Sequence, residues 1–303
     1  MSSRKKKFCK PCLILGLLVL FVILCSIPFC MISATTTGNV ALIKIDGVIT
    51  SNGGSSYFGS SSISSGTVVN FIEDAEQNPM IEAIVFEINS PGGSAVASDE
   101  IATAIKKSSK PTVSVIRELG ASGGYWIASS TDYIVANRMS ITGSIGVISS
   151  YLEFTGLMDN YGVSYQRLVA GENKDMGSPY RSLTENEEEI LQNKLDMIHD
   201  YFILEIIENR GLSEEEVRQL ATGEFFLGVE AYQYGLVDAL GDRSTAEQYL
   251  ISNYNVGEIS YVAYEEEVGL AEIFGFAYSD FALSVGEGIG NTLVGNSQQI
   301  AFT

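Results

Sequence analysis

Two short apolar runs, each rich in β-branched residues and each followed by a glycine-rich turn, restrict the fold more than any other feature of this chain. The run IEAIVFEI at residues 81–88 precedes the turn NSPGG, and the run PTVSVI at residues 111–116 precedes the turn GASGG at residues 120–124. Such runs are typical of strands, and each turn leads into a segment with helical spacing. Strands that alternate with helices are joined by right-handed crossovers and form a parallel sheet. We therefore predict an α/β fold with a largely parallel sheet of βαβ units.

The rest of the folded region continues this alternation. Further strands are expected at residues 39–49 and 133–136, and helices at residues 68–77, 98–107, 184–208 and 231–235. Thr184 with Glu187, and Ser213 with Glu216, have the spacing of capping boxes, which mark helix starts. Beyond Gly257 no clean period remains, and no element is predicted there. Because ligands meet parallel sheets at the carboxyl ends of strands, both glycine turns lie where a site is expected.

An uncharged run of twenty residues, 13–32, precedes the folded region. A helix of that length spans the hydrocarbon core of a bilayer, which is about 30 Å thick. Five of the 18 lysines and arginines fall in the first ten residues, so the positive-inside rule keeps this end cytoplasmic. We therefore expect a cytoplasmic segment at residues 1–12, a transmembrane signal anchor at 13–33 and an extracytoplasmic body. This arrangement predicts a single-pass protein of the cell membrane.

Other interpretations of the N-terminal region are weaker. A cleaved signal peptide has a shorter apolar core and a small-x-small cleavage site, which Ile32-Ser33-Ala34 matches poorly. A lipoprotein anchor needs small residues before Cys25, but residues 22–24 are Val-Ile-Leu. A zinc or redox role for the Cys-x-x-Cys pair at 9 and 12 needs further ligands, and none is nearby. The folded domain is then expected at residues 38–250, followed at 251–303 by an extension for which three interpretations stay open: contact with another subunit, contact with the membrane, or poor order.

Charge and histidine content exclude several classes of function. The formal net charge is −19, and a body this acidic repels nucleic acid. His199 is the single histidine, which is too few for a catalytic zinc site, so no metal and no cofactor are predicted. A Ser-His-Asp triad would also have to use His199, whose neighbours indicate an ordinary, partly exposed helix face. A hydrolase built on this chain therefore needs another base.

Ser122 lies in the turn GASGG directly after a predicted strand. A serine among small residues at such a place can form a tight turn that exposes its hydroxyl group, as in a nucleophile elbow. The N–H of Gly123, together with an N–H from the glycine pair at 92 and 93, could then face an oxyanion. A lysine can serve as the base if it is neutral, which costs about 4 kcal/mol for a shift of roughly three pKa units. Taken alone, each of these motifs is most often structural.

Four motifs in a fixed order carry a specific resemblance. They are INSPGGS at 88–94, GASGGYWIAS at 120–129, TGSIGV at 142–147 and NKDMGSP at 173–179. In this order they resemble the signal peptide peptidase A family in its short, one-domain form, over residues from about 39 to 242. This serine protease family is related to the Clp protease subunit and to the crotonases. The resemblance therefore implies a crotonase-like α/β fold.

The resemblance also assigns roles. Ser122 is similar to the family's nucleophile, Lys174 to its general base, and Ser144 to the hydroxyl group that orients the lysine amine. Gly93 and Gly123 match the donors of the oxyanion hole. For the short form, the resemblance implies a ring- or dome-like homo-oligomer in which neighbouring protomers complete each site. No cofactor is implied.

We therefore expect a membrane-anchored serine endopeptidase with a Ser-Lys dyad. Its peptide substrates would be signal-peptide remnants in or near the membrane, with small or apolar side chains at the cleavage point. A membrane-protein quality-control protease is the alternative among hydrolases. An inactive scaffold or an acyl-CoA-binding protein that kept the crotonase fold is the alternative from another class.

Overall fold

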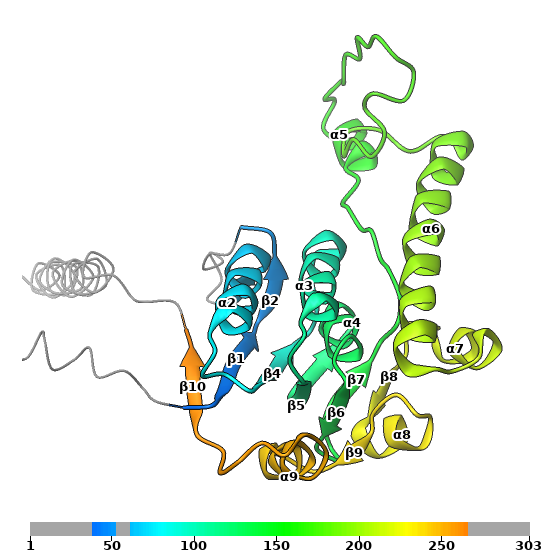
Figure 1. Ribbon diagram of the computed structural model, residues 1–303. Helices are drawn as coiled ribbons and strands as arrows, with labels where there is room; N and C mark the ends of the chain where they lie inside the picture. The colour runs from blue at the N-terminus through cyan, green and yellow to red at the C-terminus, as the bar shows by residue number, and fades with distance from the viewer. Residues whose placement is uncertain (1–37, 53–60, 266–303) are drawn as a thin grey trace, which may run out of the picture.

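The computed structural model describes residues 38–52 and 61–265, and its core is an eight-stranded sheet (Figure 1). Six strands follow one another in the order β10-β1-β4-β5-β6-β9, while β7 pairs with β5 and β8 pairs with β7. Among these described strands, only the β7–β8 pair is antiparallel. The strands are β1 (Val40–Asp46), β4 (Ala83–Ser90), β5 (Thr112–Ala121), β6 (Tyr133–Ala136), β7 (Ile141–Gly143), β8 (Phe225–Leu227), β9 (Ala239–Leu240) and β10 (Tyr261–Tyr264). A second, parallel pair joins β2 (Val48–Thr50) to β3 (Ser62–Ser64). The predicted α/β fold with a mostly parallel sheet is confirmed.

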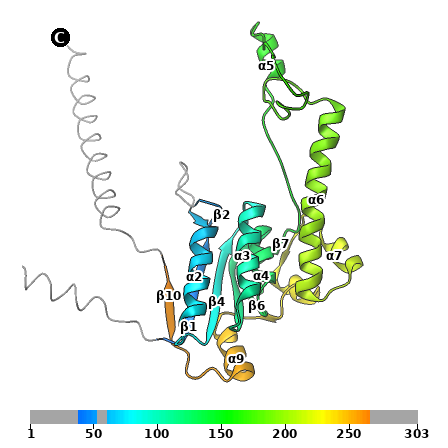
Figure 2. The same ribbon diagram turned by 45° about the horizontal axis from the view of Figure 1, so that its top comes forward.

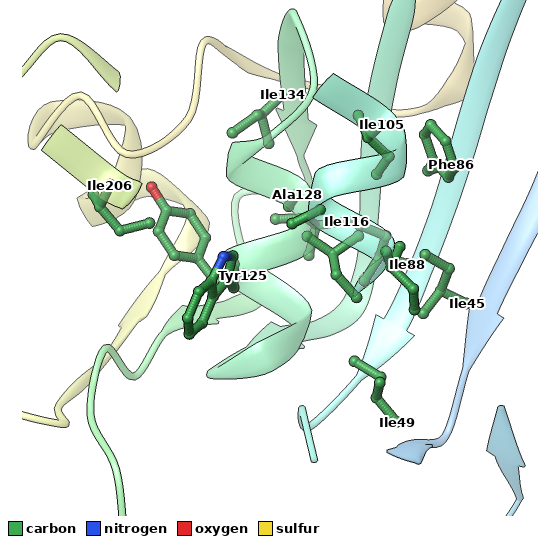
Figure 3. Close-up of a cluster of buried hydrophobic side chains, with 14 of the residues drawn as sticks. Ile45, Ile49, Phe86, Ile88, Ile105, Ile116, Tyr125, Ala128, Ile134 and Ile206 are labelled. Atoms are coloured by element: carbon green, nitrogen blue, oxygen red, sulfur yellow. The ribbon is translucent and has the colours of Figure 1, made fainter. Parts of the chain in front are cut away.

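Helices cover both faces of this sheet. They are α2 (Ser65–Gln77), α3 (Ala95–Lys107), α4 (Gly123–Ser129), α5 (Thr155–Asn160), α6 (Glu185–Arg210), α7 (Glu214–Leu220), α8 (Gly228–Gln233) and α9 (Arg243–Tyr254). Because side chains of a strand alternate between faces, Ile84 and Phe86 of β4 join one core cluster while Ala83 and Val85 join another. The first cluster includes residues of α2, and Figure 3 shows part of it with residues of α3, α4 and α6; the second cluster packs against α9. Strands buried on both faces explain the nearly continuous apolar runs of the sequence.

A long excursion separates β7 from α6. Residues 148–183, which we call the arm, include α5 and stand away from the sheet at the far end of α6 in both views (Figures 1 and 2). No residue of α5 is buried, and large apolar side chains of the arm are exposed, among them Ile148, Leu152, Tyr161 and Leu168. Helix α6 begins with the predicted capping box of Thr184 and Glu187. The arm is thus attached to the domain through a well-capped helix.

Most boundaries of helices and strands differ from the sequence prediction by a few residues. Helix α3 begins three residues earlier than expected because Ser94 caps it, accepting a hydrogen bond from the N–H of Ala97 at 3.4 Å. The predicted end of the folded domain, residue 250, falls inside α9. Strand β10 then joins the sheet in a segment where no element was predicted. The predicted segments 1–12 and 13–33, and residues 266–303, lie outside the described residues. Within residues 38–52 and 61–265, no helix combines the length and the apolar character that a membrane crossing needs.

Candidate active site

Ser122 occupies the turn between β5 and α4 in a conformation that glycine normally adopts. Its φ of 53° and ψ of −124° are close to those of the first central residue of a type II′ turn. The Ser122 N–H donates to the carbonyl of Gly143 at 2.8 Å, and its own carbonyl accepts from the N–H groups of Tyr125 and Trp126. Helix α4 behind the turn is entirely buried. A strained serine between a strand and a buried helix is the arrangement of a nucleophile elbow.

The loop after β4 brings a second backbone N–H beside this turn. The N–H of Ile49 donates to Gly92 O at 3.0 Å, and the N–H of Ser94 donates to Ile49 O at 2.8 Å. Gly93 and Ile49 thus pair as in a parallel β-bridge. In such a bridge the N–H of Gly93 itself points away from Ile49. The Gly93 nitrogen lies 3.4 Å from the position that a Cβ atom on Gly123 would occupy. Gly123 is the first residue of α4, and N–H groups of a first turn lack intrahelical partners. Two backbone donors therefore lie together next to Ser122.

These residues line one pocket of about 730 Å³. Ser122, Gly93, Gly123 and Ser144 contribute its polar floor. Its apolar wall combines the loop after β4 with α3, α4 and α6, through Pro91, Ala95, Trp126, Leu195, Ile198 and Phe202. Trp126 and Phe202 stack with ring centroids 4.7 Å apart, which stiffens the wall. The lining from α6 also includes the polar residues Gln192, Asp196 and His199, so the pocket offers an apolar wall and polar groups beside Ser122.

Ser144 follows β7 and faces the same pocket. Its backbone is also left-handed, with φ of 50°, and its N–H donates to Glu224 O at 2.9 Å. Its hydroxyl group donates to Gly223 O at 3.2 Å. The segment before β8 therefore fixes Ser144 at the pocket, close to the turn that holds Ser122.

Lys174 is not brought to the pocket within this one chain. It is exposed in a series of turns in the arm, where its N–H donates to Gly171 O at 3.1 Å. Among the described residues it lines none of the pocket and forms no ion pair. A single chain thus assembles the predicted nucleophile, the predicted oxyanion donors and Ser144, but not the predicted base.

His199 belongs to the pocket, although its sequence neighbours indicated only a helix face. It lines this pocket from α6, and its Nε2 atom is buried with no hydrogen-bond partner in the described part of the chain. Its place depends on how α6 packs against α4. No local sequence signal predicts that contact.

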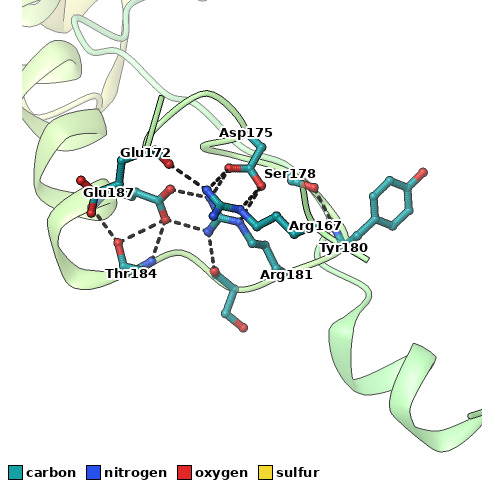
Figure 4. A network of polar contacts seen from close by, with 9 residues as sticks. Arg167, Glu172, Asp175, Ser178, Tyr180, Arg181, Thr184 and Glu187 are labelled. Atoms are coloured by element: carbon teal, nitrogen blue, oxygen red, sulfur yellow. Dashed lines mark hydrogen bonds and ion pairs between the residues drawn. The ribbon is translucent and has the colours of Figure 1, made fainter. Parts of the chain in front are cut away.

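The loop that carries Lys174 is held by a second feature that sequence reasoning did not find. Arg167 and Arg181 both bind the carboxylate of Asp175, and Arg181 also binds Glu187 (Figure 4). Hydrogen bonds from Arg167, which has the larger effect, and from Arg181 hold the pKa of Asp175 far below its ordinary value. Hydrogen bonds from Arg181 and the Thr184 backbone lower the pKa of Glu187 to about 2. The sequence indicated only the capping role of Glu187.

Comparison with known proteins identifies the family of this chain. Residues 104–256 match the model of peptidase family S49. "Putative protease MJ0651" of Methanocaldococcus jannaschii is 35% identical over 231 residues, which cover 75% of this chain and 73% of the relative. "Putative signal peptide peptidase SppA" of Enterococcus faecium is 29% identical, with 75% and 67% covered.

A plant relative extends the comparison. "Serine protease SPPA, chloroplastic" of Arabidopsis thaliana is 28% identical over 210 residues, which cover 68% of this chain and 31% of the relative. The match to the family model spans half of the chain, and the archaeal relative is matched over most of its length. The chain therefore belongs to peptidase family S49 and is a protease similar to signal peptide peptidase A.

Proposed function

We propose that this protein is a membrane-anchored serine endopeptidase with Ser122 as its nucleophile and Lys174 as its general base. The observation that carries the proposal is the turn at Ser122, where a strained serine stands next to the N–H groups of Gly93 and Gly123. Acyl transfer needs this combination, because the tetrahedral intermediate carries a negative oxygen that must be stabilised where it forms.

The reaction follows from these roles. The neutral amine of Lys174 accepts the proton of Ser122 Oγ while Oγ attacks the carbonyl carbon of the peptide bond. The oxyanion then accepts hydrogen bonds from the N–H groups of Gly93 and Gly123. The carbon–nitrogen bond breaks, Lys174 returns the proton to the leaving amine, and an ester with Ser122 remains. A water molecule, deprotonated by the same amine, hydrolyses this ester. Ser144 Oγ holds the amine in line.

A neighbouring copy of the chain supplies Lys174 in this proposal. The arm that carries Lys174 extends away from the sheet (Figure 1), Lys174 is not among the pocket's lining residues, and large apolar side chains of the arm are exposed in the single chain. Surfaces of this kind are normally covered by a partner. Closed homo-oligomers repeat one contact around an axis, so each arm can complete the pocket of the next protomer.

Signal-peptide remnants are the proposed substrates. The apolar pocket wall supports small or apolar side chains at the cleavage point, as such remnants provide. The apolar segment at residues 13–32 supports an anchor that keeps the enzyme at the membrane, where these remnants are left. A name carried by relatives, signal peptide peptidase, agrees with this substrate class.

The first experiment is hydrolysis of a fluorogenic signal-peptide analogue by the full-length protein in detergent. Wild type is compared with Ser122→Ala and Lys174→Ala, and circular dichroism verifies that each variant is folded. Both variants are expected to lose activity by about 1,000-fold or more, since each removes a participant in the chemical step. Full activity of the Lys174→Ala variant would show that the base assignment is wrong.

Mixing the two inactive variants tests whether the site is shared between subunits. Ser122→Ala and Lys174→Ala subunits are dissociated, combined and reassembled. If the base comes from a neighbour, about a quarter of the sites in a randomly mixed ring regain both groups. If both groups come from one chain, no site regains them and the mixture stays inactive. Peptides trapped by the Ser122→Ala variant in cells would separate signal-peptide remnants from misfolded membrane proteins as natural substrates.

A further inference from the structure

The guanidinium group of Arg181 binds two carboxylates, those of Asp175 and Glu187, at the same time. Its Nε and Nη2 atoms donate to the two carboxylate oxygens of Asp175 at 3.0 and 2.9 Å. Its Nη1 donates to Glu187 Oε2 at 2.7 Å, and its Nη2 also binds the other oxygen of Glu187. The side chain of Arg181 is only 19% exposed. A planar fork of five donors can bind two carboxylates in this way, whereas the single ammonium group of a lysine cannot.

Asp175, the residue directly after Lys174, is also bound by a second arginine, Arg167. Arg167 donates through Nε and Nη2 to its two oxygens at 2.8 and 2.7 Å, and also to the carbonyl of Glu172 at 2.8 Å. Both oxygens of Asp175 are therefore engaged by arginine. This arrangement fixes the turns at 171–178 around Lys174, and it occupies the carboxylate that could otherwise pair with the Lys174 amine.

Glu187 connects this loop to the rest of the domain. Its side chain is 4% exposed, and its Oε2 accepts hydrogen bonds from the N–H and the hydroxyl group of Thr184. These bonds form the start of α6, and the same helix supplies Leu195, Ile198 and Phe202 to the pocket wall. A continuous chain of contacts thus runs from the loop of Lys174, through Asp175 and Arg181, to the start of α6, and it fixes this loop on the domain that presents it to a neighbouring copy.

We propose that Arg181 is a positioning residue for catalysis, which sets the place of Lys174 by tying Asp175 to the start of α6. This inference rests on the proposed role of Lys174 as the base. Arg181 touches no reacting atom, so its contribution is geometric. A displacement of a reacting group by about 1 Å costs on the order of 100-fold in rate.

The test compares Arg181→Gln and Arg181→Lys with wild type, Lys174→Ala and a matched control, Arg218→Gln. Arg218 also binds two carboxylates, those of Glu214 and Asp200, but it lies on α7 outside the arm. Steady-state kinetics with the fluorogenic peptide give kcat and KM separately. Hydrogen exchange measures protection of amides 171–178, and sedimentation measures the oligomeric state.

The inference predicts that Arg181→Gln lowers kcat by about 100-fold and Arg181→Lys by about tenfold, with KM little changed. Amides 171–178 exchange faster in both variants, and the oligomer remains intact. Arg218→Gln behaves as wild type, because exposed ion pairs contribute little.

Three results would overturn the inference. If Lys174→Ala is inactive while both Arg181 variants keep wild-type kcat, positioning by Arg181 is wrong and the proposed function stands. If Lys174→Ala is fully active, the base assignment fails and this inference fails with it. If Arg181→Lys loses its oligomeric state together with its activity, Arg181 acts through assembly rather than by placing Lys174.

Discussion

Gly92 and Ser122 are in such close contact that a Cβ atom on Gly92 would lie 2.9 Å from the Cβ of Ser122. The same atom would lie 2.6 Å from the Gly123 nitrogen, one of the proposed oxyanion donors. Gly92 also has φ of 96°, a value that strains any other residue. The two glycine turns therefore fit against each other only while this position lacks a side chain.

Gly92→Ala is expected to lower kcat by about 100-fold or more, because loss of one oxyanion donor already costs this much. The alanine Cβ must push the Gly123 amide or Ser122 out of place. Gly211→Ala is the matched control, since Gly211 has φ of 64° and a Cβ atom added to it would meet nothing within 4 Å. This control should lose about 1 kcal/mol of stability and keep its activity. Equal kinetics for the two variants would contradict the role of the contact.

Ser122→Gly is expected to be inactive but more stable than Ser122→Ala. Both variants lack the hydroxyl group, but only glycine relaxes at φ of 53° and ψ of −124°. Strain of this kind costs about 1–3 kcal/mol, and the greater freedom of glycine in the unfolded chain offsets part of the gain. A thermal melt should place Ser122→Gly about 2–4 °C above Ser122→Ala. A lower melting temperature for the glycine variant would show that the turn is not strained.

His199→Phe separates a serine–lysine from a serine–histidine mechanism. His199 lines the pocket of Ser122, so it is the alternative base that the chain itself offers. Phenylalanine keeps an aromatic ring at this place but has no nitrogen atoms, and we expect kcat/KM to fall by about tenfold at most, which corresponds to about 1.4 kcal/mol from altered packing in the pocket. A loss as large as that of Lys174→Ala would transfer the role of base to His199.

Acid is expected to weaken the attachment of the arm through Glu187. Hydrogen bonds from Arg181 and Thr184 lower its pKa from 4.5 to about 2, so the folded state binds this proton less readily than the unfolded state. The resulting stability is fully present above about pH 4.5 and is lost as the pH falls toward 2. Glu187→Gln keeps a capping side chain but has no charge to titrate. The difference in melting temperature between wild type and Glu187→Gln should therefore shrink across this pH range. A difference that stays constant would contradict the pairing.

Local patterns in the sequence predicted four of the eight strands of the main sheet, β1, β4, β5 and β6, and the starts of α6 and α7. The strand at 133–136 has the predicted boundaries, and Thr184 and Ser213 both begin helices through complete capping boxes. These features depend on side chains a few residues apart, so they can be read along the chain. Strand β10 was missed because its four residues follow a segment with no clear period, and only its pairing with β1 defines it.

The place of each candidate residue depended on contacts between distant segments. Ser90 of β4 pairs with Gly120 of β5, across an irregularity after Ile88, and this register brings the two glycine turns together. The packing of α6 against α4 brings His199 to the same pocket. None of these contacts has a signal in local spacing.

The sequence by itself determined the alternation of strands and helices, the glycine turns and the four motifs that indicate a protease, because these depend on neighbouring residues. The tertiary structure decided that Ser122, Gly93, Gly123 and Ser144 share one pocket and that Lys174 stands apart on the arm. The physical reason is that parallel strands are joined by crossovers, so residues that meet at a sheet edge are far apart along the chain.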